Sequence, residues 1–194
     1  MINRKIALSS MSIFASLALM GGATFAFFSD SATSTGNSFA AGSFDLKIGT
    51  SAPAASDSIG AVFASANMIP GATPETATIF LRNTGTVAGN KAYLKIENVG
   101  GIDNNANQPT PMTRQVDITV SLDGTPVLIP DTNGNARQDL EDLQLSGNGL
   151  QIGTITDTGV DHTLVVTAGL NSGAGNEYQG DSVTADLRAT LTQD

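Results

Sequence analysis

The chain has 194 residues, with 9 basic and 18 acidic side chains, no cysteine, no tryptophan and a single histidine. The chain is acidic and lacks the clustered Lys and Arg side chains through which proteins bind nucleic acids and anionic membranes. Because it has no cysteine, it also has no disulfide framework. We therefore expect no nucleic-acid partner, membrane contact only in a precursor, and a fold held by its own core.

The N-terminus has the three parts of a secretory signal. Arg4 and Lys5 form a short basic region, and an apolar stretch over residues 6–28 follows. Small residues at Thr24 and Ala26 fit the −3 and −1 positions of a signal peptidase site, which favours cleavage before Phe27 over a permanent membrane span. The sequence predicts a cleaved signal peptide over 1–26 and a secreted, extracellular protein. Its mature form would carry 7 basic and 18 acidic side chains, a net charge of −11.

The segment that follows the predicted cleavage site, residues 27–38, begins with two phenylalanines and continues with Ser and Thr. A disordered tail is one interpretation. Adjacent phenylalanines favour another, an extended strand that pairs with the edge of a sheet in its own subunit or in the next. We therefore expect a free N-terminal donor segment over 27–38.

Alternation of apolar and polar residues predicts eight strands in residues 39–194. In residues 43–48, for example, Phe44, Leu46 and Ile48 share one face of a half-buried strand. The same period recurs over residues 77–81, 92–96, 116–122, 127–129, 150–152, 163–166 and 183–191.

Turn-forming pairs separate these strands. Pro70-Gly71 suits a type II turn, and Asp123-Gly124 suits a turn with positive φ. Only residues 137–145 have the spacing of a helical turn. Two half-apolar sheets must cover each other, so the sequence predicts an all-β fold: a single two-sheet β-sandwich of jelly-roll type over 39–194.

Residues 131–142 are the best candidate for a metal site. Oxygen-bearing side chains stand at positions 1, 3, 5, 9 and 12 of this segment, as in a calcium loop: Asp131, Asn133, Asn135, Asp139 and Asp142. Glycine falls at position 4 instead of 6, and the last ligand is Asp instead of Glu. Asn and Asp in loops more often form Asx turns. We expect that the protein requires no cofactor, with calcium as a candidate ligand of this loop.

Three stretches of the sequence resemble the TasA and camelysin (CalY) family of secreted biofilm-matrix fibre proteins. The first combines GGATFAFFSD at 21–30, similar to the family's export signal, with NSFAAGSFDL at 37–46. The second is the Pro-Gly turn of NMIPG at 67–71, followed by NTGT at 83–86. The third is YQGDSV at 178–183. Residues 100–160 match no family pattern.

The resemblance implies a jelly-roll subunit that is exported through a dedicated signal peptidase and polymerises head to tail into extracellular fibres. It also implies donor-strand complementation, in which the strand freed by cleavage inserts into the sheet of the neighbouring subunit. Phe27, Phe28 and Phe39 are the expected anchors, each worth about 1.5 to 3 kcal/mol if fully buried. The sequence leaves open whether an accessory matrix subunit takes part.

Two other functions remain as alternatives. A monomeric adhesin or carbohydrate-binding module would favour an exposed aromatic platform, for which Tyr93 and Tyr178 are the only tyrosines. A camelysin-type metalloprotease would need two or three clustered zinc ligands and a carboxylate base. The chain offers only His162, which we expect to be a surface strand residue. We therefore expect a structural protein and no catalytic residues.

Overall fold

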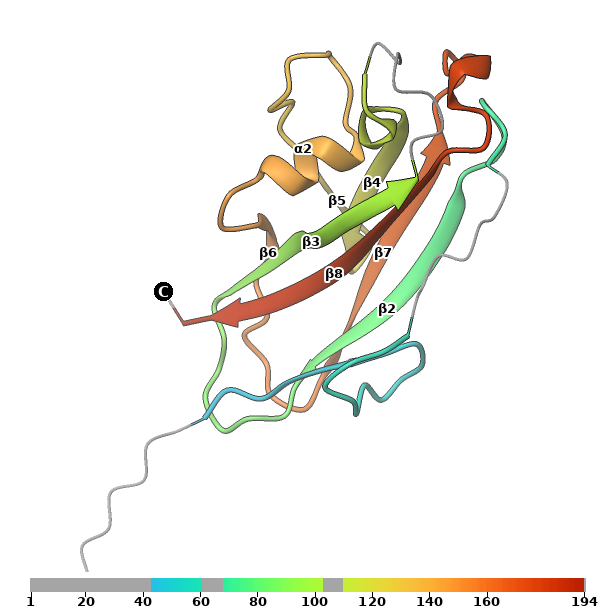
Figure 1. Cartoon of the computed structure of the whole chain (residues 1–194). Coiled ribbons are helices and arrows are strands. Elements are labelled where there is room, and N and C mark those ends of the chain that lie inside the picture. The colour runs from blue at the N-terminus through green and yellow to red at the C-terminus, as the bar shows by residue number, and fades with distance from the viewer. Residues whose placement is uncertain (1–42, 61–67, 103–109, 194) are drawn as a thin grey trace, which may run out of the picture. The chain divides into compact units, whose positions relative to one another are not determined.

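The computed structural model describes residues 43–60, 68–102 and 110–193, which belong to the compact unit Ala41–Asp194 (Figure 1). The predicted signal peptide and donor segment lie outside the described residues. No helix in the described ranges has the length and hydropathy required to cross a membrane.

The described chain is built mainly of β-strands. In chain order the elements are β1 (Leu46–Gly49), β2 (Glu75–Asn83), β3 (Lys91–Ile102), the 3-10 turn η1 (Met112–Arg114), β4 (Val116–Leu122), β5 (Thr125–Val127), α2 (Leu140–Leu145), β6 (Leu150–Gly153), β7 (Asp161–Leu170), the 3-10 turn η2 (Asn176–Tyr178) and β8 (Ser182–Thr192).

These strands form two sheets. The larger has the order β1-β2-β7-β4-β5 and the smaller the order β6-β3-β8, and every pair of neighbours is antiparallel. Figure 1 shows β3 and β8 running together across β2 and β7. The predicted all-β sandwich is thereby confirmed, whereas its jelly-roll type stays a prediction.

The core lies between the sheets and follows the predicted alternation. In β4, Val116, Ile118 and Val120 are buried, and Thr119 between them is exposed. The side chains of Leu81, Leu143 and Ile155 are fully buried, so strand, helix and loop all contribute to one cluster. Burial of each such side chain stabilises the fold by roughly 1.5 to 3 kcal/mol.

Two predicted turns have the expected conformations. The Ala72 N–H donates to the Ile69 carbonyl at 3.1 Å, and Gly71 has φ of 69°, as a type II turn requires after Pro70. Between β4 and β5, Asp123 and Gly124 both have positive φ, which gives the tight twisted turn of a two-residue hairpin.

Helix α2 lies inside the segment 137–145, which the sequence predicts as a helical turn. It starts at a capping box, in which the Asp139 carboxylate accepts from the Asp142 N–H and the Asp142 carboxylate accepts from the Asp139 N–H. Glycines at 147 and 149 with positive φ follow it and prevent its continuation.

Candidate functional site

The two sheets have four edges, and three of them are short or covered. Strand β1 has four residues and Ser56 bridges to it; β5 has three residues, one of them Pro126; β6 has four residues. Short strands, proline and covering loops are the usual means of preventing unwanted strand addition. The fourth edge, β8, has eleven residues and no proline, and among the described strands it pairs only with β3.

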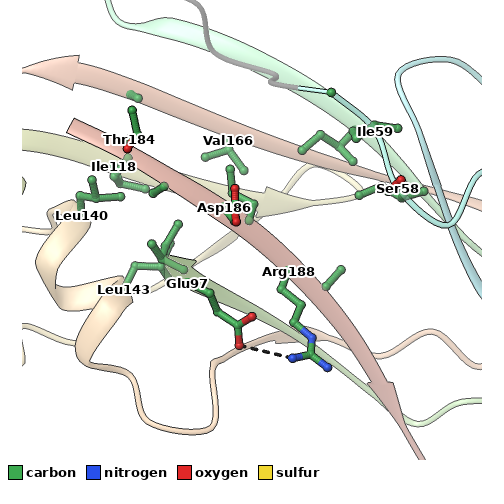
Figure 2. A pocket seen from close by; sticks show the side chains of 18 of the residues that line it. Ser58, Ile59, Glu97, Ile118, Leu140, Leu143, Val166, Thr184, Asp186 and Arg188 are labelled. Carbon is green, nitrogen blue, oxygen red and sulfur yellow. Dashed lines mark hydrogen bonds and ion pairs between the residues drawn. The ribbon is translucent and has the colours of Figure 1, made fainter. Parts of the chain in front are cut away.

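An open groove of about 710 Å³ lies between β8 and the facing edge of the larger sheet (Figure 2). Residues of β1 and the segment 57–60 line one side of the groove, and residues 183–189 of β8 line the other. Figure 2 shows Leu140 and Leu143 of α2, with Ile118 and Val166, along its floor. The part of the sandwich that the structure describes is therefore open along the β8 side.

The side chains of β8 that point between the sheets are only half-buried. Val183, Ala185, Leu187, Ala189 and Leu191 pack against the core, yet each keeps intermediate exposure, while the alternate residues up to Thr190 are exposed. Strands inside a sandwich normally bury such positions completely, as β4 does. The groove thus has the character of a core that lacks one strand.

The charged groups at the rim of the groove have partners within the chain. Glu97 accepts from Arg188 at 3.4 Å (Figure 2), and Asp186 accepts from the side chain of Asn98 at 2.7 Å. Asp57 pairs with Lys47 at 2.7 Å. The rim therefore presents little unbalanced charge, and an apolar or main-chain ligand fits the groove better than an ion.

The motif at residues 83–86 holds the chain where it leaves the sandwich toward the donor segment. The Thr84 N–H donates to the Asp45 carbonyl at 2.7 Å, and the Thr86 N–H donates to the Ser43 carbonyl at 2.9 Å. A Cβ on Gly85 would overlap the Ser43 carbonyl and come within 2.8 Å of the Asp45 nitrogen, so only glycine fits there. We call residues 43–45 and 83–87 the N-terminal clamp.

The buried Asn83 completes this clamp. Its side-chain oxygen accepts from the Gly85 N–H at 3.0 Å, and its amide group donates to the Val87 carbonyl at 2.8 Å. The Asn83 side chain has no exposure, and these two hydrogen bonds satisfy its buried oxygen and amide group. The family-like NTGT sequence therefore has a structural role.

An ion pair lies beside the clamp. Hydrogen bonds from Lys47 and then Thr84 lower the pKa of the Asp45 carboxyl from its ordinary value. Hydrogen bonds to Asp45 and Asp57 raise the pKa of the Lys47 ammonium. Because both groups remain partly exposed to solvent, the pair orients the first residues of β1 more than it stabilises the fold.

The structure brings the five calcium-candidate residues together in one loop. The fully buried Asp142 carboxylate accepts from the Thr132 N–H at 2.7 Å and the Asn133 N–H at 3.0 Å. The side chains of Asn133 and Asn135 donate to the Asp139 carboxylate, which is also fully buried.

Asp131 completes this loop. Its carboxylate accepts from the backbone N–H groups of Asn135 and Ala136 at 3.0 and 2.8 Å. Chain donors therefore satisfy all three carboxylates, as in the Asx turns that are the alternative interpretation. Calcium binding stays a prediction.

His162 belongs to β7, and its side chain is mostly covered, with 13% exposure, instead of lying open on the surface as expected. One ring nitrogen bonds Asp123 at 2.7 Å, and the other is buried with no partner among the described residues. In the described ranges no three His, Asp or Glu side chains are grouped as metal ligands.

Residues outside those ranges add Asp30, Asp103 and Asp194 but no further histidine. A zinc peptidase centre needs nitrogen or sulfur ligands from several side chains. The donor set of this chain does not fit such a centre.

The tyrosines do not form an exposed platform. Tyr178 is buried, and its hydroxyl bonds the Thr110 side chain at 2.7 Å and accepts from Gln115 at 3.2 Å. Tyr93 lies on β3 with intermediate exposure. The YQGDSV motif therefore fixes the turn before β8 instead of presenting an aromatic binding surface.

The remaining predicted site residues lie outside the described residues. These are the cleavage-site residues Thr24, Ala26 and Phe27, and the anchors Phe27, Phe28 and Phe39. Sequence reasoning missed the groove and the β8 edge, because both depend on strand order. The one signal in the sequence was the length of the period-two pattern at 183–191, which is long for an edge strand.

Comparison with known proteins gives one family. A family model described as camelysin metallo-endopeptidase matches residues 1–123, which include the first two motifs and end at the β4–β5 turn. The third motif lies outside the match. No curated protein matches the chain.

Proposed function

The chain belongs to the camelysin metallo-endopeptidase family, and from that premise and the open groove we propose that it is a structural subunit of an extracellular fibre. In this proposal export removes residues 1–26, and the freed N-terminal segment of one copy occupies the groove beside β8 of another. The copies form a homopolymer by strand donation.

The observation that carries this proposal is the β8 edge. In the part of the chain that the structure describes, β8 pairs only with β3, so residues 182–191 offer main-chain hydrogen bonds, and the half-buried side chains beneath them gain burial when a strand is added. A soluble monomer that exposes such an edge risks uncontrolled association, so proteins normally protect it. Among the described residues the three other edges are short or covered, whereas no second strand or proline protects β8 over residues 182–191.

The donor side of the proposal is tested by replacing residues 27–38 in the full precursor with a Gly/Ser segment of equal length. We expect the exported variant to remain a soluble monomer, because the segment loses its phenylalanine anchors. Negative-stain microscopy and size-exclusion chromatography provide the readout. Fibres that form normally from this variant would refute strand donation.

The acceptor side is tested by a matched pair of lysine substitutions on β8. Ala189→Lys places a charge toward the groove and should prevent assembly, whereas Thr190→Lys places it on the exposed face and should not. Circular dichroism of both monomers checks folding, since a long side chain at a half-buried position can extend to solvent. Equal assembly of both variants would show that the β8 groove is not the acceptor.

The family name favours a second candidate, a metallo-endopeptidase. This reading predicts zinc-dependent cleavage of casein by the purified protein, abolished by His162→Ala. We propose instead that the chain is not an enzyme, since it has one histidine and no cysteine with which to bind zinc. Activity that follows zinc and His162 would overturn that proposal.

A further inference from the structure

The face of the smaller sheet that points away from the core carries three basic side chains. Lys91 and Lys95 lie on β3 at positions that alternate with the buried Ala92 and Leu94, so both point outward. Arg188 lies on β8 directly opposite Lys95. The sequence shows no such cluster, because only the pairing of β3 with β8 brings Arg188 to this face from a distant part of the chain.

These three cations have weaker ionic partners than the other basic side chains of the described residues, each of which contacts a carboxylate at 3.2 Å or less. Lys95 and Arg188 share the Glu97 carboxylate at 3.6 and 3.4 Å (Figure 2). Lys91 forms no ion pair in the part of the chain that the structure describes. This face therefore keeps an excess of positive charge at one end, although the chain as a whole is acidic.

The order of charges across the β3–β8 pair does not serve folding. Lys95 lies opposite Arg188, and the next outward pair along the strands sets Glu97 opposite Asp186. Like charges directly opposite each other on a sheet are destabilising, whereas exchange of the two β8 side chains would place opposite charges together. The Asn98 side chain donates to Asp186 at 2.7 Å, which leaves Glu97 to serve both cations. Such separation of charge is typical of a surface that binds a group of the opposite sign.

Tyr93 lies between the two lysines on the same outward face of β3, with intermediate exposure. Its neighbours across the sheet are Gln151 on β6 and Thr190 on β8, and both are exposed. A phenol ring offers an apolar face together with a hydroxyl group, and amide and hydroxyl side chains both donate and accept hydrogen bonds. These groups match the apolar ring face and the hydroxyl groups of a sugar. A single ring is no aromatic platform, but it is enough to stack on one sugar unit.

We propose that this surface binds an acidic polysaccharide. We call it the outer patch, and its residues are Lys91, Tyr93, Lys95, Gln151, Arg188 and Thr190. Its cations bind carboxylates of the polymer, and the ring of Tyr93 stacks on a sugar unit between them. The two lysines lie about 13 Å apart along β3, so the polymer contacts the patch through more than one unit.

Duplex DNA fits the outer patch less well than an acidic polysaccharide does. DNA carries one negative charge about every 1.7 Å along its axis. The acidic remainder of the chain repels so dense a polyanion, and three cations do not offset that repulsion. A polysaccharide with carboxylates on separate sugar units presents fewer charges to the same surface.

The outer patch and the groove use opposite faces of β8. Arg188 and Thr190 point outward and alternate with Leu187 and Ala189, which pack toward the core. A strand added beside β8 would leave the outer patch uncovered, so polysaccharide binding and assembly do not compete. In a fibre the patch would recur in every subunit, and many weak sites would bind one polymer with high avidity. The inference goes beyond the proposed function and does not depend on it.

Frontal affinity chromatography of the freshly exported protein tests the proposal. Immobilised polygalacturonate is the probe. Its fully methyl-esterified form keeps the sugar units and removes the charges, and immobilised duplex DNA is the third matrix. We expect retention on polygalacturonate that decreases as salt is raised, because salt screens exposed charges, and little retention on the other two matrices.

Substitutions on the sheet locate the binding surface. Lys95→Gln and Arg188→Gln should each weaken binding by up to about fivefold, as expected for exposed ion pairs, and Tyr93→Ala should weaken it by a similar factor. Arg114→Gln removes the same charge outside the outer patch and should not change retention. Thr190→Lys adds a cation beside Tyr93 and should strengthen binding. Circular dichroism checks that each variant is folded.

Absence of retention on polygalacturonate, equal retention on its methyl ester, or stronger retention on DNA would overturn the inference. An equal effect of Arg114→Gln would also overturn it, since net charge and not the outer patch would then be responsible. If the patch variants lower self-association in sedimentation velocity and leave retention unchanged, the face binds a second copy and not a polysaccharide. Fibre formation is scored separately by microscopy, so each of these results leaves the proposed function standing.

Discussion

Replacement of Asp142 by alanine should destabilise the protein strongly, although this residue does not line the groove beside β8. The carboxylate accepts from three backbone N–H groups, those of Thr132, Asn133 and Asp139, at 2.7, 3.0 and 3.2 Å. It has no exposure, so water cannot replace it in the folded state. Each buried donor left without an acceptor costs about 1 to 3 kcal/mol.

The net cost is smaller than the sum of these terms, because removal of a buried charge recovers part of its desolvation penalty. We expect a loss of about 3 kcal/mol, which for a chain of this size lowers the melting temperature by about 6 to 12 °C. Asp142→Asn keeps one acceptor oxygen and should lose less. The exposed Asp157→Ala removes the same charge and should change the melting temperature little.

The chain has no tryptophan to report unfolding by fluorescence. Thermal unfolding followed by far-UV circular dichroism therefore measures these differences. If Asp142→Ala melts within about 2 °C of the parent, the three N–H groups have found other acceptors, and the account of this loop is wrong. If Asp157→Ala loses as much stability as Asp142→Ala, net charge and not hydrogen bonding is responsible.

The remaining predictions concern the clamp, the third motif and the loop at 131–142. Gly85→Ala should detach residues 43–45 and accelerate amide exchange at Asp45, whereas Gly60→Ala, which meets no atom within 4 Å, should not. Tyr178→Phe should lower unfolding free energy by about 1 to 2 kcal/mol in urea, since Gln115 loses a buried partner; an unchanged midpoint would argue against that bond. Lys47→Met should raise the pKa of Asp45 toward its ordinary value, as carboxyl NMR titrations would show. The lowered pKa of Asp45 stabilises the fold above the ordinary carboxyl pKa, and this contribution is lost as the pH falls. The substitution should therefore reduce that contribution. EDTA should leave the melting temperature unchanged, because chain donors satisfy the loop carboxylates; a fall reversed by calcium but not magnesium would show that the ion is required.

Much of the fold follows from local pattern, and the exceptions have physical causes. Residues 116–122 alternate clearly and form β4 with those bounds, because that strand has one buried and one exposed face. Strand β1 starts at Leu46 and not at Ser43, since the carbonyl groups of Ser43 and Asp45 accept from residues 84–87 of the clamp. The strand predicted over 92–96 is longer in the structure, where β3 continues to Ile102 through a bulge at Asn98, which has positive φ.

The candidate site was less predictable, because it depends on contacts between distant residues. Asp139 and Asp142 suit a calcium loop and a capping box equally well in sequence, and the structure shows the capping box, while calcium binding stays a prediction. The openness of β8 results from the order of strands in two sheets, which no local pattern encodes. His162 is similar, since Asp123, which covers it, is 39 residues away.

The N-terminal clamp also determines how a fibre of this kind would resist pulling. In the proposed fibre, tension reaches each subunit through residue 43, which continues into β1 alongside β2. Because β1 runs away from the pulled end, the force acts along the strand axis and loads the bonds of Ser43, Asp45 and β1 together instead of one after another. Rupture in this shear geometry is limited by the rate of unfolding and not by equilibrium stability. The four residues of β1, of which Leu46 and Ile48 pack at the margin of the core, would then set the mechanical strength of the assembly.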